Sequence, residues 1–388
     1  MTAIQRFERT RKLTPERRDV FYKWLRFGSI VVGSNQFTGL DPQEAKNLDN
    51  DQLAELKSKV QILDEVREDL ETTHSEDPKY IVDFLGCAKA YFSYHAALDF
   101  GFETKERVAT STTTIERFMD YLLQQEACPE YNDDILQTRN FCRNASEQLW
   151  NVEQAKTMMP GEFNRACSTL FDGYYAKNLM TVRPQWSDEA QTGPVYVGLT
   201  DEEASQIFGM AMSTVASDDV YEKYLEYTTD GRNDLAVVRT IKDEGFEITQ
   251  LEPPTDENKN LYLTQAKDYR PLGRVLAKPW TDPYAAPEDL TEEEIGAARR
   301  SRGAEQEVYV FFIEADLMQY VQQGQKVLAT IKQMNCGVWF FEECTTLYPS
   351  FENYIMNELM LSFKAPRALQ STSEQQQEDP KTEDKADA

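Results

Sequence analysis

The 388-residue sequence lacks most of the patterns on which membrane, zinc-binding and secreted proteins depend. It contains only two histidines, and no two of its six cysteines form a C-x-x-C pair. No apolar run approaches the ~20 residues that a membrane-spanning helix needs. The N-terminus also lacks the apolar stretch of a secretory signal peptide. We therefore expect a protein of the cytosol or nucleus whose cysteines are small buried apolar residues, without a zinc site.

The motifs of nucleotide-binding and nucleophilic enzymes are absent as well. There is no G-x-x-x-x-G-K-[ST] phosphate loop, no G-x-G-x-x-G and no G-x-S-x-G. The pairs Asp133–Asp134 and Asp218–Asp219 could act in acid–base chemistry or hold magnesium, but 67 acidic residues produce such neighbours by chance. His95 lies among aromatic and alanine residues and is expected to be structural, whereas His74 lies in a polar break. We predict no catalytic residue, no metal site, no cofactor and no enzyme activity.

Positive charge is scarce and concentrated at one end of the chain. The formal net charge is -26, yet residues 1–27 carry eight Lys/Arg against three Asp/Glu, which leaves about -31 on the remainder. An acidic body repels nucleic acid and is better suited to a basic protein partner. The basic segment is thus the part of the chain that could face phosphate.

Aromatic residues alternate with the cations of this segment, and a helix is predicted there. Thr14 can cap it, Pro15 fits its first turn and Gly28 can end it. Val20, Phe21, Trp24 and Leu25 fall on one stripe.

Two interpretations of the stripe are open. Exposed aromatics and arginines dominate interface energetics, so Arg17, Arg18, Phe21 and Trp24 are our candidate partner-binding residues. Alternatively, Phe21 and Trp24 dock onto the protein's own core.

The longest predicted helix runs from Tyr131 to Thr157. Its apolar and small residues alternate at spacings of four and three, which is typical of a helix-packing seam: Tyr131, Ile135, Thr138, Cys142, Ala145, Leu149 and Val152. The rise per residue gives a length of about 40 Å, enough for the spine of a helical domain.

Shorter helices are expected on both sides of this spine. The segment KYIVDF (Lys79 to Phe84) is either a short strand or the start of a helix through Tyr94. The other predicted helices cover about Asp49 to Leu70, Ser111 to Glu126, Glu162 to Phe171 and, behind a Thr200–Glu203 capping box, a segment to about Ala216.

Beyond residue 230 the pattern changes to strands. LAVVRTI (Leu235 to Ile241) and FEITQL (Phe246 to Leu251) flank Asp-Glu-Gly and predict a hairpin. EVYVFFI (Glu307 to Ile313) is apolar on both faces, as in a central strand. KVLATIKQM (Lys326 to Met334) and VWFFEE (Val338 to Glu343) predict a second hairpin around Gly337.

Together these elements predict an α+β protein with a helical N-terminal half around the long helix, a mainly antiparallel β C-terminal half and a disordered acidic tail. The predicted divisions are a basic-aromatic arm and helix (1–28), a helical region (29–179), an irregular linker or loop (180–198), an α+β region (199–366) and the tail (367–388).

Several stretches, in order along the chain, resemble one fungal family, the argonaute-binding subunit of the Argonaute siRNA chaperone (ARC) complex. They are RRDVFYKWLRFGS (Arg17 to Ser29), KYIVDF, CPEYNDDIL (Cys128 to Leu136), PGEFNRACSTLFDGYY (Pro160 to Tyr175), RPLGRVLAKPW (Arg270 to Trp280) and NCGVWFFEE (Asn335 to Glu343).

The resemblance implies a non-catalytic subunit that binds an Argonaute protein carrying duplex siRNA, together with a second accessory subunit. It implies restraint of slicing or passenger-strand release, support of RNA-mediated gene silencing, histone methylation and heterochromatin assembly, and a location in nucleus and cytoplasm. The siRNA would be held indirectly, through Argonaute, and no membrane would be involved. The residues themselves leave a second function open, direct RNA binding through the basic N-terminal arm.

Overall fold

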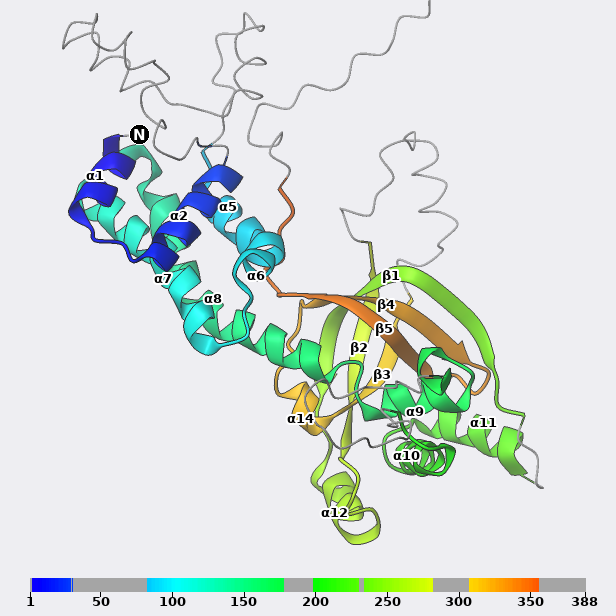
Figure 1. Cartoon of the computed structure of the whole chain (residues 1–388). Coiled ribbons are helices and arrows are strands. Elements are labelled where there is room, and N and C mark those ends of the chain that lie inside the picture. The colour runs from blue at the N-terminus through cyan, green and yellow to red at the C-terminus, as the bar shows by residue number, and fades with distance from the viewer. Residues whose placement is uncertain are drawn as a thin grey trace, which may run out of the picture.

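The computed structural model describes residues 2–28, 30, 82–177, 198–229, 234–281 and 307–355. Within these ranges a helical half and a sheet half are joined by one long helix (Figure 1). The predicted α+β architecture, helical first and antiparallel β second, is confirmed. The predictions for the helix from Asp49 to Leu70, for His74, for the 180–194 segment and for the acidic tail lie outside the described residues, and the division into domains stays a prediction.

The helical half begins with two short helices that pack on longer ones. In chain order it contains α1 (Thr2–Thr10), α2 (Pro15–Phe27), α5 (Phe84–Ala90), a π-helical turn (Tyr91–His95), α6 (Ala96–Phe100), α7 (Lys105–Gln124), a 3₁₀ turn (Pro129–Tyr131) and α8 (Asn132–Met158). Local signals set most of the ends. The Thr14 hydroxyl accepts the Arg17 N–H at the start of α2, as predicted, and Gly28 ends that helix.

Two other starts also follow from side-chain caps. Of the segment KYIVDF, residues 79–81 lie outside the described residues; the expected helix through Tyr94 begins only at Phe84, because Asp83 caps α5 by accepting the Gly86 N–H at 2.6 Å. α7 begins earlier than the predicted Ser111, because Thr104 accepts the Arg107 N–H. A polar cap therefore outweighs the more polar composition of the first turns.

The long helix α8 is confirmed as the spine. Its predicted seam from Ile135 to Val152 is buried, with Tyr131 partly buried before the helix. The first part of the seam contributes to the helical core, whereas Val152 and Ala155 contribute to the core of the sheet. The segment after the last strand returns to the helices, where Phe351 packs on Phe141 with ring centroids 4.8 Å apart. Both connections tie the halves together.

The sheet half consists of five antiparallel strands covered by helices (Figure 1). Its elements are α9 (Glu162–Leu170), a 3₁₀ turn (Tyr174–Lys177), α10 (Asp201–Thr214), α11 (Asp218–Thr228), β1 (Val237–Glu252), α12 (Asp256–Gln265), β2 (Leu272–Trp280), β3 (Tyr309–Glu314), α14 (Ala315–Met318), β4 (Lys326–Met334) and β5 (Trp339–Tyr348). The strand order is β3-β2-β1-β4-β5.

The predicted first hairpin is wrong. Residues 237–252 form one strand, β1, which pairs with β4 and β2 and not with itself. The turn-like Asp-Glu-Gly lies within β1 at an irregularity, where the register of pairing with β4 shifts between Ile241 and Glu244. Gly245 is needed there because a Cβ would lie 2.5 Å from the Trp280 ring. Glycine marks a close approach between strands here, not a turn.

The expectation of a central strand at 307–313 is also wrong. β3 lies at the edge of the strand order, although it is buried on both faces as its composition indicates. The sheet curves so that β3 approaches β5: the ring centroids of Tyr309 and Trp339 are 4.8 Å apart, and those of Phe311 and Phe341 are 5.0 Å apart. The second predicted hairpin, β4 to β5 around Gly337 with φ of 98°, is confirmed.

Candidate partner-binding surfaces

The four candidate partner-binding residues do not share one surface. Phe21 and Trp24 are 0% and 4% exposed, with ring centroids 4.9 and 6.0 Å from that of Phe118 on α7. The alternative, docking onto the protein's own core, is therefore confirmed. As candidate surface residues Phe21 and Trp24 must be corrected, because the stripe they share with Val20 and Leu25 is the buried face of α2.

Arg17 and Arg18 stay at the surface of α2. Arg18 is exposed, whereas Arg17 is partly buried and its Nη1 donates to the hydroxyls of Thr113 and Thr114 at 3.1 and 3.3 Å. Their contact with a partner stays a prediction.

Arg17 lines a cavity of about 470 Å³ between the α1–α2 turn and α7. We call it the basic cavity and define it by Arg11, Lys12, Arg17 and Arg117. Burial, and then the positive charge of Arg117, lower the pKa of Arg17. Arg117 was not predicted as a site residue, because nothing in the sequence of α7 indicates that position 117 lies next to the N-terminal segment.

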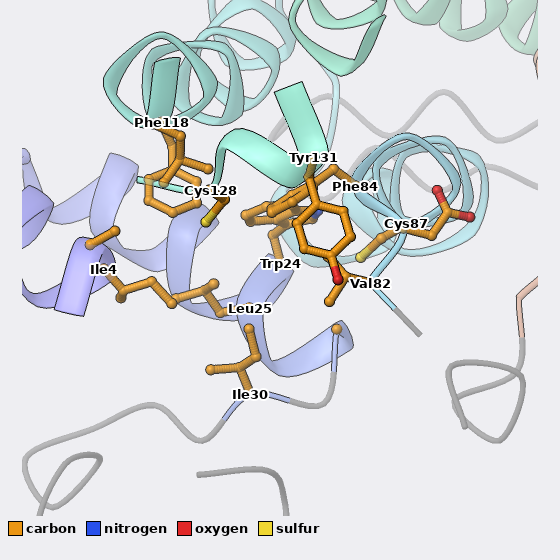
Figure 2. Close-up of a pocket in the computed structure, with 14 residues that line it drawn as sticks. Ile4, Trp24, Leu25, Ile30, Val82, Phe84, Cys87, Phe118, Cys128 and Tyr131 are labelled. Carbon is orange, nitrogen blue, oxygen red and sulfur yellow. The ribbon is translucent and has the colours of Figure 1, made fainter. Parts of the chain in front are cut away.

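A second cavity, of about 210 Å³, opens between α1, α2, α5 and the turn before α8 (Figure 2). Its wall is almost entirely apolar and includes Ile4, Leu25, Phe84 and Tyr131 around the Trp24 indole. Burial raises the pKa of Cys87 to about 12, so this thiol is protonated and unreactive at neutral pH. The cavity could accept an apolar side chain and offers no chemistry.

The remaining candidates of acid–base chemistry have structural roles. His95 is half-buried with its ring centroid 4.8 Å from that of Phe27, and burial lowers its pKa. The Asp134 carboxylate accepts the backbone N–H groups of Phe84 and Leu85 at 2.7 and 3.1 Å, which ties α8 to the start of α5. Asp218 and Asp219 lie in the first turn of α11, where negative charge favours the helix.

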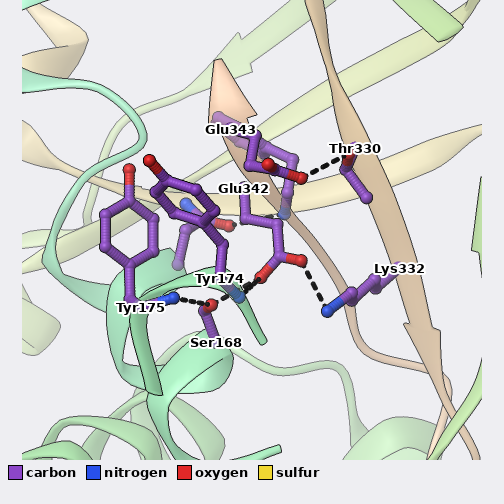
Figure 3. A network of polar contacts seen from close by, with 9 residues as sticks. Ser168, Tyr174, Tyr175, Thr330, Lys332, Glu342 and Glu343 are labelled. Carbon is purple, nitrogen blue, oxygen red and sulfur yellow. Dashed lines mark hydrogen bonds and ion pairs between the residues drawn. The ribbon is translucent and has the colours of Figure 1, made fainter. Parts of the chain in front are cut away.

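A buried polar network at the sheet was not predicted (Figure 3). Glu342 on β5 accepts hydrogen bonds from the Ser168 hydroxyl and from the Tyr174 N–H, and its other oxygen lies 2.5 Å from Lys332 Nζ. The Lys332 and Glu342 side chains are only 11% and 4% exposed. Both carboxylate oxygens of Glu342 are bonded to neighbours that anchor α9 and the following turn to the sheet. The network therefore stabilises the fold.

A second buried acid and a neighbouring asparagine connect α9 to the two edge strands of the sheet. Glu314 accepts the Phe163 N–H at 2.7 Å, and its burial raises its pKa to about 7. Beside it, Asn164 donates to the Phe312 carbonyl on β3 at 3.0 Å and accepts the Phe341 N–H on β5 at 3.1 Å. Asn164 therefore bridges β3 and β5, whereas Glu314 ties the start of α9 to the end of β3. The sequence signal for this site was Glu314 itself, an acidic residue directly after the apolar run that ends at Ile313.

The helix α11 presents an open, acidic surface on the sheet half. It contains no buried residue, and it carries four acidic residues against one lysine. Tyr221 and Leu225, one turn apart, are 37% and 41% exposed. An exposed apolar pair within an acidic helix suits a partner that offers apolar contacts inside a basic surface.

Neither a metal centre nor a membrane span emerges in the described ranges. No group of three or more His, Cys, Asp or Glu residues there could hold a metal ion. No helix of these ranges combines the length and apolar character required to cross a bilayer.

Comparison with known proteins places this arrangement in a family context. The family model described as Argonaute siRNA chaperone (ARC) complex subunit Arb1 matches residues 1–366. The sequence is similar to "Argonaute-binding protein 1" of Schizosaccharomyces pombe, with 25% identity over 168 residues. That alignment covers 43% of this chain and 39% of the length of the yeast protein. No solved structure matches the chain.

Proposed function

The chain belongs to the Arb1 family of Argonaute siRNA chaperone (ARC) complex subunits, and we propose that it works by binding an Argonaute protein that carries duplex siRNA. The observation that carries this proposal is the match over residues 1–366, which spans both halves of the fold. The name of the yeast relative, Argonaute-binding protein 1, supports it.

The charge of the chain supports a docking mode for this binding. With a net charge of -26, the protein can approach a basic, nucleic-acid-facing surface with favourable long-range electrostatics. We place the contact at α11, because Tyr221 and Leu225 provide apolar anchors among four carboxylates. Occupying that basic surface would restrain slicing or release of the passenger strand.

The wider role follows from the same proposal. A second accessory subunit would complete the complex, and its action in nucleus and cytoplasm would support RNA-mediated gene silencing, histone methylation and heterochromatin assembly. No bond-breaking step is assigned to this chain; the acids Asp134, Glu314 and Glu342 are each held by backbone N–H groups or an ion pair.

Capture of purified Argonaute tests the docking mode. The Tyr221→Ser/Leu225→Ser variant should bind Argonaute about tenfold more weakly, since exposed aromatic and aliphatic anchors carry much of an interface's energy. The matched control is Leu261→Ser/Leu263→Ser on α12, another helix with exposed leucines, and it should bind like wild type. Affinity should also fall as salt is raised.

Equal capture of both double variants would remove α11 from the interface, and an affinity indifferent to salt would remove the electrostatic mode. Restraint of slicing is tested separately. Argonaute loaded with duplex siRNA should cleave the passenger strand more slowly when the chain is present. An unchanged cleavage rate despite complex formation would contradict the restraint while leaving Argonaute binding intact.

A second candidate function, direct RNA binding by the N-terminal region, is favoured by the basic cavity. Deletion of the N-terminal segment is not a suitable test of RNA binding. Removing residues 1–27 would take away Phe7, Phe21 and Trp24, which are buried in the helical core, and would disturb the fold itself. Point substitutions of the arginines avoid that problem.

A further inference from the structure

We propose that the basic cavity binds a phosphate group of an RNA backbone. The inference rests on the proposed function for its choice of ligand, because the family is described as an siRNA chaperone. It goes further in naming a site: Arg11 and Lys12 from the α1–α2 turn, Arg17 from α2 and Arg117 from α7 surround one cavity of about 470 Å³.

Positive charge predominates in the wall of the basic cavity. The cavity is lined by four cations and by one carboxylate, Asp120. That carboxylate is already engaged, since it lies 3.5 Å from Arg139 Nη1 and 3.7 Å from Arg143 Nη2 on α8. Within the described ranges, none of the four cavity cations forms an ion pair. Four cations thus surround a cavity whose single carboxylate is shared with two arginines of α8, and the charge of Glu16, next to Arg17 in the chain, offsets only part of this positive charge.

The Arg17 guanidinium is oriented but not neutralised by its neighbours. Its Nη1 is held by two neutral hydroxyls, which orient the guanidinium without neutralising it. No hydrogen bond from Nε or Nη2 is made to a described residue, so a fork of donors remains for an oxyanion. The like charge of Arg117 opposes that of Arg17 and would be compensated by a bound anion.

The cationic residues of α1 favour RNA over a single phosphorylated side chain as the ligand. Arg6 and Arg9 are exposed on α1, the helix whose last residue, Thr10, lines the cavity. A nucleic-acid strand offers one phosphate per nucleotide, so it can place one group in the cavity and others along the helix. A lone phosphoserine would meet the cavity only. The Thr10 and Gln124 side chains in the wall add polar partners for a sugar–phosphate unit.

Fluorescence anisotropy with a short labelled duplex RNA tests the site in the full-length chain. Arg17→Gln/Arg117→Gln should raise the Kd about tenfold or more and reduce the slope of log K against log salt by about 1 to 2. Arg107→Gln/Arg239→Gln makes the same change of net charge at exposed arginines outside the cavity, and its Kd should stay within about threefold of wild type. Equal Kd values for the two double variants would overturn the proposal.

Folding is controlled with Arg117→Gln alone, because Arg117 is exposed and makes no ion pair or side-chain hydrogen bond within the described ranges. It should unfold like wild type and still bind RNA more weakly; unaltered RNA affinity in this variant would contradict the site. A phosphopeptide that displaces the RNA as well as unlabelled RNA does would refute the choice of ligand.

Argonaute capture separates the two proposals. Loss of RNA affinity with normal capture supports the cavity alone, whereas failed capture by wild type would refute Argonaute binding without affecting the RNA measurement.

Discussion

The two halves of this protein bury polar groups in different ways. In the helical half the buried polar residues are hydroxyls such as Thr112 and Thr138, which bond to carbonyls of their own helix. In the sheet half they include the charged or amide side chains Glu314, Lys332, Glu342 and Asn164, each of which bonds to another helix or strand. A helix satisfies its backbone internally, whereas the strand edges β3 and β5 need groups from α9. The sheet half is therefore expected to be the more sensitive to substitution and pH.

The largest effect is expected at the buried ion pair. Lys332→Met leaves the Glu342 carboxylate in the core without its cation, which should lower the free energy of unfolding by about 3–5 kcal/mol. The surface pair Lys278–Glu247, at 3.2 Å, is the control, and Lys278→Met should change it by less than about 1 kcal/mol. Urea denaturation measures both. Similar losses in the two variants would contradict the distinction between buried and exposed pairs.

A smaller, pH-dependent effect is expected at Glu314. Its pKa rises from 4.5 to about 7 on folding, so the folded state holds the proton more tightly than the unfolded chain. The stabilising contribution is complete below pH 4.5 and is lost as the pH rises through about 7. Glu314→Gln keeps an acceptor for the Phe163 N–H and stays neutral.

At pH 8 this variant should therefore be more stable than wild type by about 2–3 kcal/mol, and at pH 4.5 the two should be nearly equal. Thermal or urea unfolding across this range checks the difference. A constant difference between the two proteins at all pH values would show that Glu314 does not titrate in the folded state.

The smallest effect is expected in the helical half. Thr138→Val removes a fully buried hydroxyl that donates to the Asp134 carbonyl at 2.8 Å within α8. No buried donor is left without a partner, so stability should change by less than about 1 kcal/mol. A loss comparable with that of Lys332→Met would remove the contrast between the halves.

The predictions succeeded where neighbouring residues specify the structure, and they failed where residues distant in the sequence do. Thr14 and Pro15, the Thr200–Glu203 box and the α8 seam specify helices through neighbours a few residues away, and those predictions are confirmed. Asp-Glu-Gly at 243–245 has the local chemistry of a turn, but strand pairing with β2 and β4 overrides it. The central position predicted for the strand at 307–313 failed because the helix α9 buries an edge strand as thoroughly as another strand would.

The candidate site shows the same division. Composition and periodicity are local properties, and they suffice to predict the positive charge near the N-terminus, the aromatic stripe of α2 and the long helical spine. Packing between distant elements turns Phe21 and Trp24 inward, buries Glu314 and Glu342, and brings Arg17 and Arg117 to one cavity. Those outcomes depend on contacts between residues about a hundred or more positions apart, and no local pattern specifies which surfaces the folded chain brings together.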